Sequence, residues 1–336
     1  MSTRCHTCDE DLEDEARFCG VCGVSLVDEN FGRTIARRYQ LRQRVGAGSL
    51  GAVYKAEQTG TRRKIAIKLL PGNAQHDPLA TERFRREGHV LVNLRSQHTI
   101  TTYEFDREPD GSLYIAMELS PGRSLAHVLR HDGPLPWQTV MRILLGLCNS
   151  LGEAHAMGVV HRDLKPENII VEERPSDAYF VKVSDFGLAK ILGANLRISP
   201  VGQNVGSVEY SSPEQLLDRG LDARSDIYGL GVLAFLLITG QHPFAESRTF
   251  GEMVAAHIHA PAPLLRTVRA DVPADVESLI ACMLEKNPDR RYPSAQTLGA
   301  QISLLLSGVP AEPGATIRTD EAEEDTYLAE VPKKAD

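Results

Sequence analysis

The stretch "HRDLKPEN", residues 161–168, places an arginine, an aspartate, a lysine and an asparagine within seven positions of one another. Any charged surface loop that contains a proline could have this composition, and charge runs are usually solvated. The stretch therefore indicates a function only if other parts of the chain supply groups that work with it.

The composition is that of a globular protein large enough for about two domains, with 336 residues of which 42% are hydrophobic. The longest apolar stretch, "GLGVLAFLLITG" at 229–240, is shorter than the ~20 residues that cross a bilayer. The polar start "MSTRCHTCDED" lacks the apolar region of a signal peptide. We expect a cytoplasmic protein with no membrane partner. The net charge of −8 argues against a nucleic-acid partner, because phosphate binding requires a basic face.

The acidic charge is concentrated at the two ends. Residues 1–30 carry two basic and eight acidic side chains, and residues 311–336 carry three and eight. The end segment 311–336 is also poor in periodic apolar residues, which is typical of disorder. We therefore predict three parts: a module at 1–30, a core domain at 31–310, and an acidic, disordered tail at 311–336.

Four cysteines in the first part form two CxxC pairs, Cys5 with Cys8 and Cys19 with Cys22, ten residues apart. Two such turns can present four thiolates to one tetrahedral zinc ion. Disulfides are a weaker interpretation because no export signal precedes them and the cytosol keeps thiols reduced. A single redox CxxC would not explain the pair. The segment resembles the zinc ribbons at the N-termini of many bacterial multidomain proteins, and its acidic charge favours a protein partner for it over nucleic acid.

Three glycines follow, Gly46, Gly48 and Gly51, in "VGAGSLGAVYKAE" at 45–57. This spacing also occurs at dinucleotide sites, where a helix begins directly after the glycines. Here the sequence alternates, turns at Thr59-Gly60 and alternates again, which predicts two strands. A strand-turn-strand flap can approach phosphates closely, because glycine has no side chain in the way.

The second strand, "KIAIKLL" at 64–70, places Lys68 on the same face as the small apolar Ala66. A lysine in such a place requires an anion. In "ERFRREGHVLVNL" at 82–94, Glu87 shares a helical stripe with Phe84, Leu91 and Leu94. Glu87 is therefore the expected partner of Lys68, and an exposed Glu at the edge of the stripe is the alternative.

Residues from about 39 to 305 resemble a serine/threonine protein kinase catalytic domain of the bacterial type. The resemblance rests on nine motifs in the family's order, which a chance match would not reproduce. They are the glycine loop at 46–51, "IAIK" at 65–68, Glu87, "MELSPG" at 117–122, "HRDLKPEN" at 161–168, "DFG" at 185–187, "SPE" at 212–214, "SDIYGLG" at 225–231 and "NPDRRYPSA" at 287–295.

The resemblance implies a bilobal α+β fold, preceded here by the small zinc-ribbon module. A β-rich N-lobe at about 39–119 would carry the glycine loop, and a helical C-lobe at about 120–305 would carry the catalytic loop. Glu214 would pair with Arg291, and Asp226 would brace the catalytic loop.

The resemblance also assigns roles in phosphoryl transfer, which depends on positioning and on neutralising charge at the γ-phosphate. Asp163 would orient the substrate hydroxyl, and Lys165 would offset charge on the phosphoryl group. Lys68, held by Glu87, would contact the α- and β-phosphates. Asn168 and Asp185 would bind Mg²⁺, with Mn²⁺ as an alternative.

The implied ATP site holds adenine through main-chain groups next to Met117, the gatekeeper position. The Glu118 carbonyl would accept a hydrogen bond from the adenine amino group, and the Ser120 amide would donate one to the ring. The other implied nucleotide contacts are Val45, Gly46, Ala47, Gly48, Ser49, Leu50, Gly51, Ala52, Val53, Ala66 and Ile170.

Lys165, two residues after Asp163, is the serine/threonine version of the catalytic loop, and Ser207 stands where such kinases usually carry a catalytic threonine. We expect protein substrates with Ser or Thr acceptors, autophosphorylation and a role in bacterial signal transduction. The alternatives are a nucleotide-binding pseudokinase scaffold and a zinc-dependent adaptor. A pseudokinase commonly lacks the lysine, the catalytic aspartate or the metal aspartate, and all three are present here.

Arg162 precedes the catalytic aspartate, and an arginine there would pair with a phosphate on the activation segment. Between residues 188 and 206, Ser199 is the one hydroxyl residue. Either Ser199 is an autophosphorylation switch, or the segment is held by neutral contacts and the enzyme is always active.

Overall fold

The structure is a computed structural model that describes residues 28, 30–48, 51–70, 88, 90–186, 208–247 and 249–308, together with the dipeptides 3–4 and 11–12. Those dipeptides form β1 (Thr3–Arg4) and β2 (Asp11–Leu12), which pair antiparallel. Several predicted features lie outside the described residues. These are the four zinc-ribbon cysteines, Ser49, Leu50, Glu87, Ser199, Ser207 and the segment 311–336.

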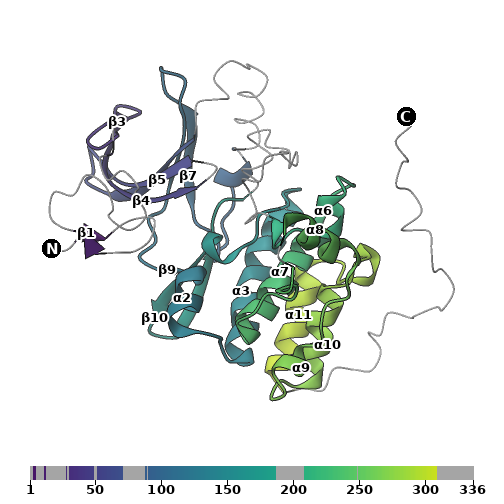
Figure 1. Cartoon of the computed structure of the whole chain (residues 1–336). Helices are drawn as coiled ribbons and strands as arrows, with labels where there is room; N and C mark the ends of the chain where they lie inside the picture. Colours follow the sequence, from purple (N-terminus) through teal and green to yellow (C-terminus); the bar gives the residue numbers. More distant parts are fainter. Residues whose placement is uncertain are drawn as a thin grey trace, which may run out of the picture.

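The described core domain has two lobes, as predicted, with strands in one and mostly helices in the other (Figure 1). The N-lobe is an antiparallel sheet in the order β3-β4-β5-β6-β8-β7. Its strands are β3 (Thr34–Ile35), β4 (Tyr39–Gly48), β5 (Gly51–Gln58), β6 (Lys64–Leu70), β7 (Thr102–Arg107) and β8 (Leu113–Met117).

Strand β6 is central in this sheet, and all its residues after Lys64 are buried. Its β-branched and aliphatic residues suit a strand covered on both faces. Lys68 therefore lies in a buried strand and is only 5% exposed. An ammonium group in such a place needs an anionic neighbour.

Residues 28 and 30–38 are attached to this sheet by polar contacts. Asp28 Oδ1 accepts a hydrogen bond from the Tyr54 hydroxyl at 3.1 Å, and Arg33 forms an ion pair with Asp110. The fully buried Ile35 belongs to β3, which pairs with the start of β4. The predicted boundary between residues 30 and 31 thus falls within a segment bonded to the N-lobe.

A second, three-stranded sheet has the order β11-β10-β9. Its strands are β9 (Arg123–Ser124), β10 (Ile169–Arg174) and β11 (Asp177–Val183). The catalytic loop enters β10 through the 3₁₀ turn η2 (Pro166–Asn168), and Asp185 follows the end of β11. This hairpin therefore brings two sequence motifs to one place.

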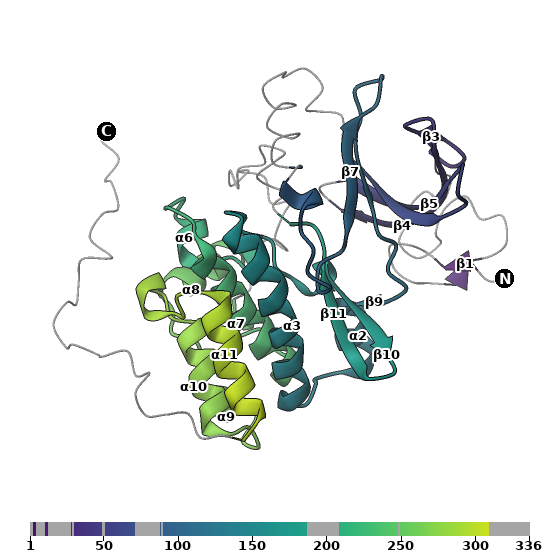
Figure 2. The same ribbon diagram turned by 180° about the vertical axis from the view of Figure 1, so that it is seen from behind.

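The C-lobe helices pack around α7 (Ala223–Thr239), whose residues are almost all buried. The helices are α2 (Leu125–Asp132), α3 (Trp137–Ala156), α6 (Pro213–Leu216), α8 (Phe250–His259), α9 (Leu265–Val268), α10 (Ala274–Met283) and α11 (Ala295–Leu306), with the 3₁₀ turn η3 (Pro288–Arg290). Viewed from behind, α3, α7 and α11 run side by side (Figure 2).

The apolar stretch 229–240 forms the C-terminal part of α7 and the residue that follows it, Gly240. Gly240 has a φ of 75°, the left-handed value that glycine allows at a helix end. Among the described residues, no helix combines the length and hydropathy needed to cross a membrane.

Candidate active site

Asp226 of α7 forms hydrogen bonds with the catalytic loop, which lies between α3 and β10. Its carboxylate accepts hydrogen bonds from the main-chain N–H groups of His161 at 2.8 Å and Arg162 at 2.9 Å. His155 Nε2 lies 2.7 Å from the same carboxylate. This confirms that Asp226 braces the loop. Arg162 has a positive φ of 69°, a strained conformation that persists when the surroundings fix it.

Three predicted residues of the loop meet at the Asp163 carboxylate. Lys165 Nζ lies 2.8 Å from Asp163 Oδ2. Asn168 Nδ2 donates to the same oxygen at 3.0 Å and to the Asp163 carbonyl at 2.8 Å. The Asp163 side chain keeps 18% of its surface exposed, so it is accessible from solvent.

Asp185 and Lys68 come from different lobes and form an ion pair, with Lys68 Nζ 2.8 Å from Asp185 Oδ2. Asp185 also has a positive φ, 63°. The expected contact of Lys68 with Glu87 cannot be described, because Glu87 lies outside the described residues. The ion pair shows that the cleft brings the lysine of β6 to the aspartate after β11.

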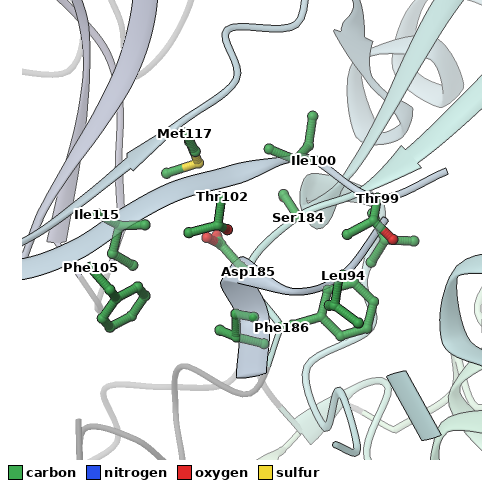
Figure 3. A pocket seen from close by; sticks show the side chains of 12 residues that line it. Leu94, Thr99, Ile100, Thr102, Phe105, Ile115, Met117, Ser184, Asp185 and Phe186 are labelled. Atoms are coloured by element: carbon green, nitrogen blue, oxygen red, sulfur yellow. The ribbon is translucent and has the colours of Figure 1, made fainter. Parts of the chain in front are cut away.

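A pocket is lined by Asp185 and by the predicted gatekeeper Met117 (Figure 3). Asp185 and Phe186 both line this pocket, together with Leu94 and Thr102. Apart from a few polar groups its walls are apolar: Leu91, Leu94, Thr99, Ile100, Thr102, Phe105, Ile115, Met117, Val183, Ser184, Asp185 and Phe186. Sequence reasoning gave site roles to Met117 and Asp185, and it placed Leu91 and Leu94 on an apolar helical stripe and Phe186 in the "DFG" motif, but it did not predict the pocket itself.

The glycine motif forms a hairpin of β4 and β5, as predicted, in which Gly48 pairs with Gly51. Strand β5 begins at the last of these glycines, where a dinucleotide site would begin a helix, so the dinucleotide interpretation is excluded. Gly51 has a φ of 126°, and a Cβ atom on it would come within 2.0 Å of the Leu69 carbonyl oxygen. Only glycine fits there.

The predicted adenine contacts lie on elements that border the cleft. Val53 of β5 is paired with Lys68 of β6, and Ala66 is paired with Met117 of β8. Ile170 lies on β10, and Val45 is 39% exposed. Gly46 and Ala47 belong to β4 and Ala52 to β5.

The segment after β8 carries Glu118 and Ser120, and both side chains bond to residues that sequence reasoning missed. Glu118 forms an ion pair with Lys182, and Ser120 Oγ donates to Glu172 Oε1 at 2.8 Å. Strand alternation gives no reason to bury Lys182 and Glu172, which are each 8% exposed. Only the contacts in the folded structure show that these two residues belong to the site.

The described residues include a donor set suited to Mg²⁺. Asn168 uses its amide nitrogen on Asp163, which leaves its amide oxygen as an acceptor, and Asp185 supplies a carboxylate. Carboxylate and amide oxygens are ligands that Mg²⁺ prefers. Within the described ranges, no group of three or more His, Cys, Asp or Glu side chains is arranged to hold a metal ion.

Below the site, Glu214 of α6 and Arg291 form the predicted ion pair, with Nη1 to Oε1 at 2.7 Å and Nη2 to Oε2 at 2.9 Å. Burial alone would raise the pKa of Glu214, but the hydrogen bonds and charge of Arg291 outweigh it and lower the pKa.

Ser212 caps α6 in a reciprocal pair with Gln215. Gln215 in turn donates to the Arg162 carbonyl at 2.9 Å. Helix α6 is thereby attached to the catalytic loop.

Comparisons with known proteins agree with this geometry. The family model described as protein kinase domain matches residues 39–301. The serine/threonine-protein kinase pkn3 of Myxococcus xanthus is 36% identical over 83% of this chain and 52% of its own length. The serine/threonine-protein kinase PknE of Mycobacterium tuberculosis is 35% identical over 80% of this chain and 46% of its own.

The chain thus spans about half the length of these curated relatives. The crystal structure of the Mycobacterium tuberculosis PknI kinase domain superposes with a TM-score of 0.63 and 24% identity. It covers 82% of this chain and 99% of that one, which shows the shared fold. The bilobal fold, the residues gathered at Asp163 and the family match together show that this chain belongs to the protein kinase domain family.

Proposed function

We propose that the protein transfers the γ-phosphoryl group of ATP to Ser or Thr hydroxyls of protein substrates, including its own. The observation that carries this proposal is that Lys165 and Asn168 both bond to the Asp163 carboxylate; the Lys68–Asp185 ion pair supports it. Its relatives in Myxococcus xanthus and Mycobacterium tuberculosis are named serine/threonine-protein kinases, which supports the acceptor type. Bacterial signal transduction in the cytoplasm is the proposed setting.

In the proposed reaction, the Asp163 carboxylate accepts or orients the proton of the attacking hydroxyl, while Lys165 stabilises negative charge beside it. Lys68 binds the α- and β-phosphates, with Glu87 as its proposed second partner. Ser207 is the proposed contact of Lys165 from the activation segment. Mg²⁺, or Mn²⁺ in its place, would be held by Asn168 and Asp185 and would neutralise phosphate charge when bound.

The main chain of Glu118 and Ser120 binds the adenine in this proposal. The glycine loop and the apolar residues around it enclose the nucleotide. The proposed contacts are Val45, Gly46, Ala47, Gly48, Ser49, Leu50, Gly51, Ala52, Val53, Ala66 and Ile170.

The test is transfer of labelled phosphate from ATP to a generic protein substrate, in parallel for the wild type and Asp163→Asn. We expect labelled phosphoserine and phosphothreonine with the wild type, and loss of the label when the metal is chelated. Equal labelling by the Asp163→Asn variant would contradict catalysis by this site. Nucleotide binding without any transfer would favour the pseudokinase scaffold instead.

We also propose that Cys5, Cys8, Cys19 and Cys22 bind one structural Zn²⁺ and that the resulting module recruits a protein partner. Elemental analysis of the full-length protein should find one zinc per chain. The double substitution Cys19→Ser, Cys22→Ser should abolish it, because two ligands of the tetrahedral set are lost. Since catalysis needs nothing from the module, labelling of a generic substrate should continue. Zinc retained in the double mutant would exclude this site.

Regulation through Arg162 is a further part of the proposal. Its Nε is buried and has no hydrogen-bond partner among the described residues. A buried donor without a partner is consistent with a guanidinium that binds an anion in another state of the protein. We expect intact-mass analysis after ATP treatment to show phosphate on Ser199, and Ser199→Ala to lower activity. Full activity of that variant, with Ser199 unmodified in the wild type, would favour an enzyme that is always active.

A further inference from the structure

Lys182 lies at the centre of a buried charge network behind the segment that follows β8. Lys182 belongs to β11, lies three positions before Asp185 in the chain, and is 8% exposed. Its Nζ forms an ion pair with Glu118 Oε1 and lies 3.8 Å from Glu172 Oε1. One ammonium group thus faces two carboxylates, one directly after β8 and one on β10.

The first carboxylate, that of Glu118, is hydrogen-bonded to Thr101, the residue before β7. Glu118 Oε2 accepts a hydrogen bond from the Thr101 N–H at 3.2 Å, and the Glu118 N–H donates to the Thr101 carbonyl at 2.9 Å. Side chain and main chain of Glu118 are therefore held together.

The second carboxylate, that of Glu172, anchors Ser120. Ser120 Oγ donates to Glu172 Oε1 at 2.8 Å and accepts from the Gly122 N–H at 3.2 Å. Arg174 donates to Glu172 Oε2 through Nε at 3.1 Å and Nη2 at 2.7 Å. Burial would raise the pKa of Glu172, but Arg174, Ser120 and Lys182 outweigh it and lower the pKa, so the carboxylate stays ionised.

The network also lies next to Ile170, one of the predicted nucleotide contacts. Ile170 is the cross-strand partner of Lys182, and Glu172 lies two residues further on the same face of β10. A Cβ atom on Gly122 would come within 2.3 Å of the Val171 carbonyl oxygen and 2.8 Å of the Ile170 side chain. The chain from Ser120 to Gly122 is thus pressed against the strand that carries Glu172.

We propose that Lys182 is a positioning residue of the nucleotide site, which holds Glu118 and Glu172 so that the main-chain groups of Glu118 and Ser120 stay aligned for adenine. This inference rests on the proposed function of those two groups. Without Lys182, two partly buried carboxylates would lose a shared cation and repel each other. The adenine contacts would then weaken while the groups at Asp163 keep their places.

The experiment compares the full-length wild type, Lys182→Met and Lys182→Arg, with Arg123→Met as a matched control. Arg123 is an exposed cation of the neighbouring strand β9 that pairs with Glu173. Calorimetry gives the Kd for Mg-ATP, and steady-state kinetics separate KM from kcat. We expect Kd and KM to rise about tenfold in Lys182→Met, as for the loss of one hydrogen bond, with kcat within about twofold. Lys182→Arg should restore most of the affinity, and Arg123→Met should match the wild type.

Several outcomes would overturn the inference. Unchanged ATP affinity in Lys182→Met is one, and a higher kcat at constant affinity, which would indicate a restraint on the lobes, is another. Should Lys182→Met fail to fold, Glu118→Gln keeps the shape of the side chain but removes the ion pair, and it should weaken ATP binding about threefold, a smaller loss because the amide can still bond. Unchanged affinity in that variant also overturns the inference. A wild type that binds no ATP would instead contradict the proposed function.

Discussion

Replacing Lys68 by methionine is expected to lower kcat at least ~100-fold, the loss typical when one preorganised charge at the reacting groups is removed. Lys68 is 5% exposed, and its Nζ lies 2.8 Å from Asp185 Oδ2. Because the position is buried, no other cation can easily take the place of its ammonium group. Methionine fills nearly the same volume, and we expect the melting temperature to change by no more than a few degrees. Phosphate transfer and thermal unfolding measured on one preparation test both expectations.

Lys64→Met provides the matched control, because Lys64 begins the same strand but is exposed. It should retain the activity of the wild type. If Lys68→Met lost activity only in proportion to the fraction unfolded, the assignment of Lys68 to phosphate binding would have no support.

The largest stability effect is expected from Arg291→Met. Arg291 is 2% exposed, and all five N–H donors of its guanidinium are used. Two go to Glu214, and three go to the carbonyls of Glu285, Arg224 and Lys286. Breaking a buried pair from one side costs about 3–5 kcal/mol, so the melting temperature should fall by about 10 °C. Arg290→Met, at the exposed neighbouring position, should leave it nearly unchanged.

The stabilisation by this ion pair should depend on pH. The pKa of Glu214 in the folded state lies below its ordinary value of 4.5. The pair therefore stabilises the fold fully above that ordinary value and loses its contribution as the pH falls through the folded-state pKa. The stability difference between wild type and Arg291→Met should shrink in acid. A difference that stayed constant down to about pH 3 would show that packing, not the ionised pair, causes the effect.

The sequence predicted the fold and the centre of the site because their motifs are local or occur in a fixed order. The hairpin of β4 and β5, the brace by Asp226 and the Glu214–Arg291 pair are all present. The Lys182 network escaped prediction because Glu118 lies 64 positions away in the chain. Neither strand alternation nor the spacing of charges along the chain indicates that these two residues meet. They come together only when β11 folds against the end of β8.

The same reason explains the missed role of Gln215, which reaches the Arg162 carbonyl across 53 positions. The attachment of residues 28–38 was also missed. Their partners Glu104, Glu108 and Asp110 lie on the far strand β7 and the turn that follows it, so no local pattern relates the two segments.

Strand β3 has a consequence for any shortened form of the protein. The family match begins at residue 39, so a chain trimmed to that match would lose β3 and expose the N–H and C=O groups at the start of β4. Uncovered strand edges pair readily with other chains, and removal of Ile35 would open an apolar surface beside Tyr39 and Leu41. Such a chain should self-associate in solution, whereas β3, which is two residues long and is followed by Arg37 and Arg38, closes this edge without offering a new one.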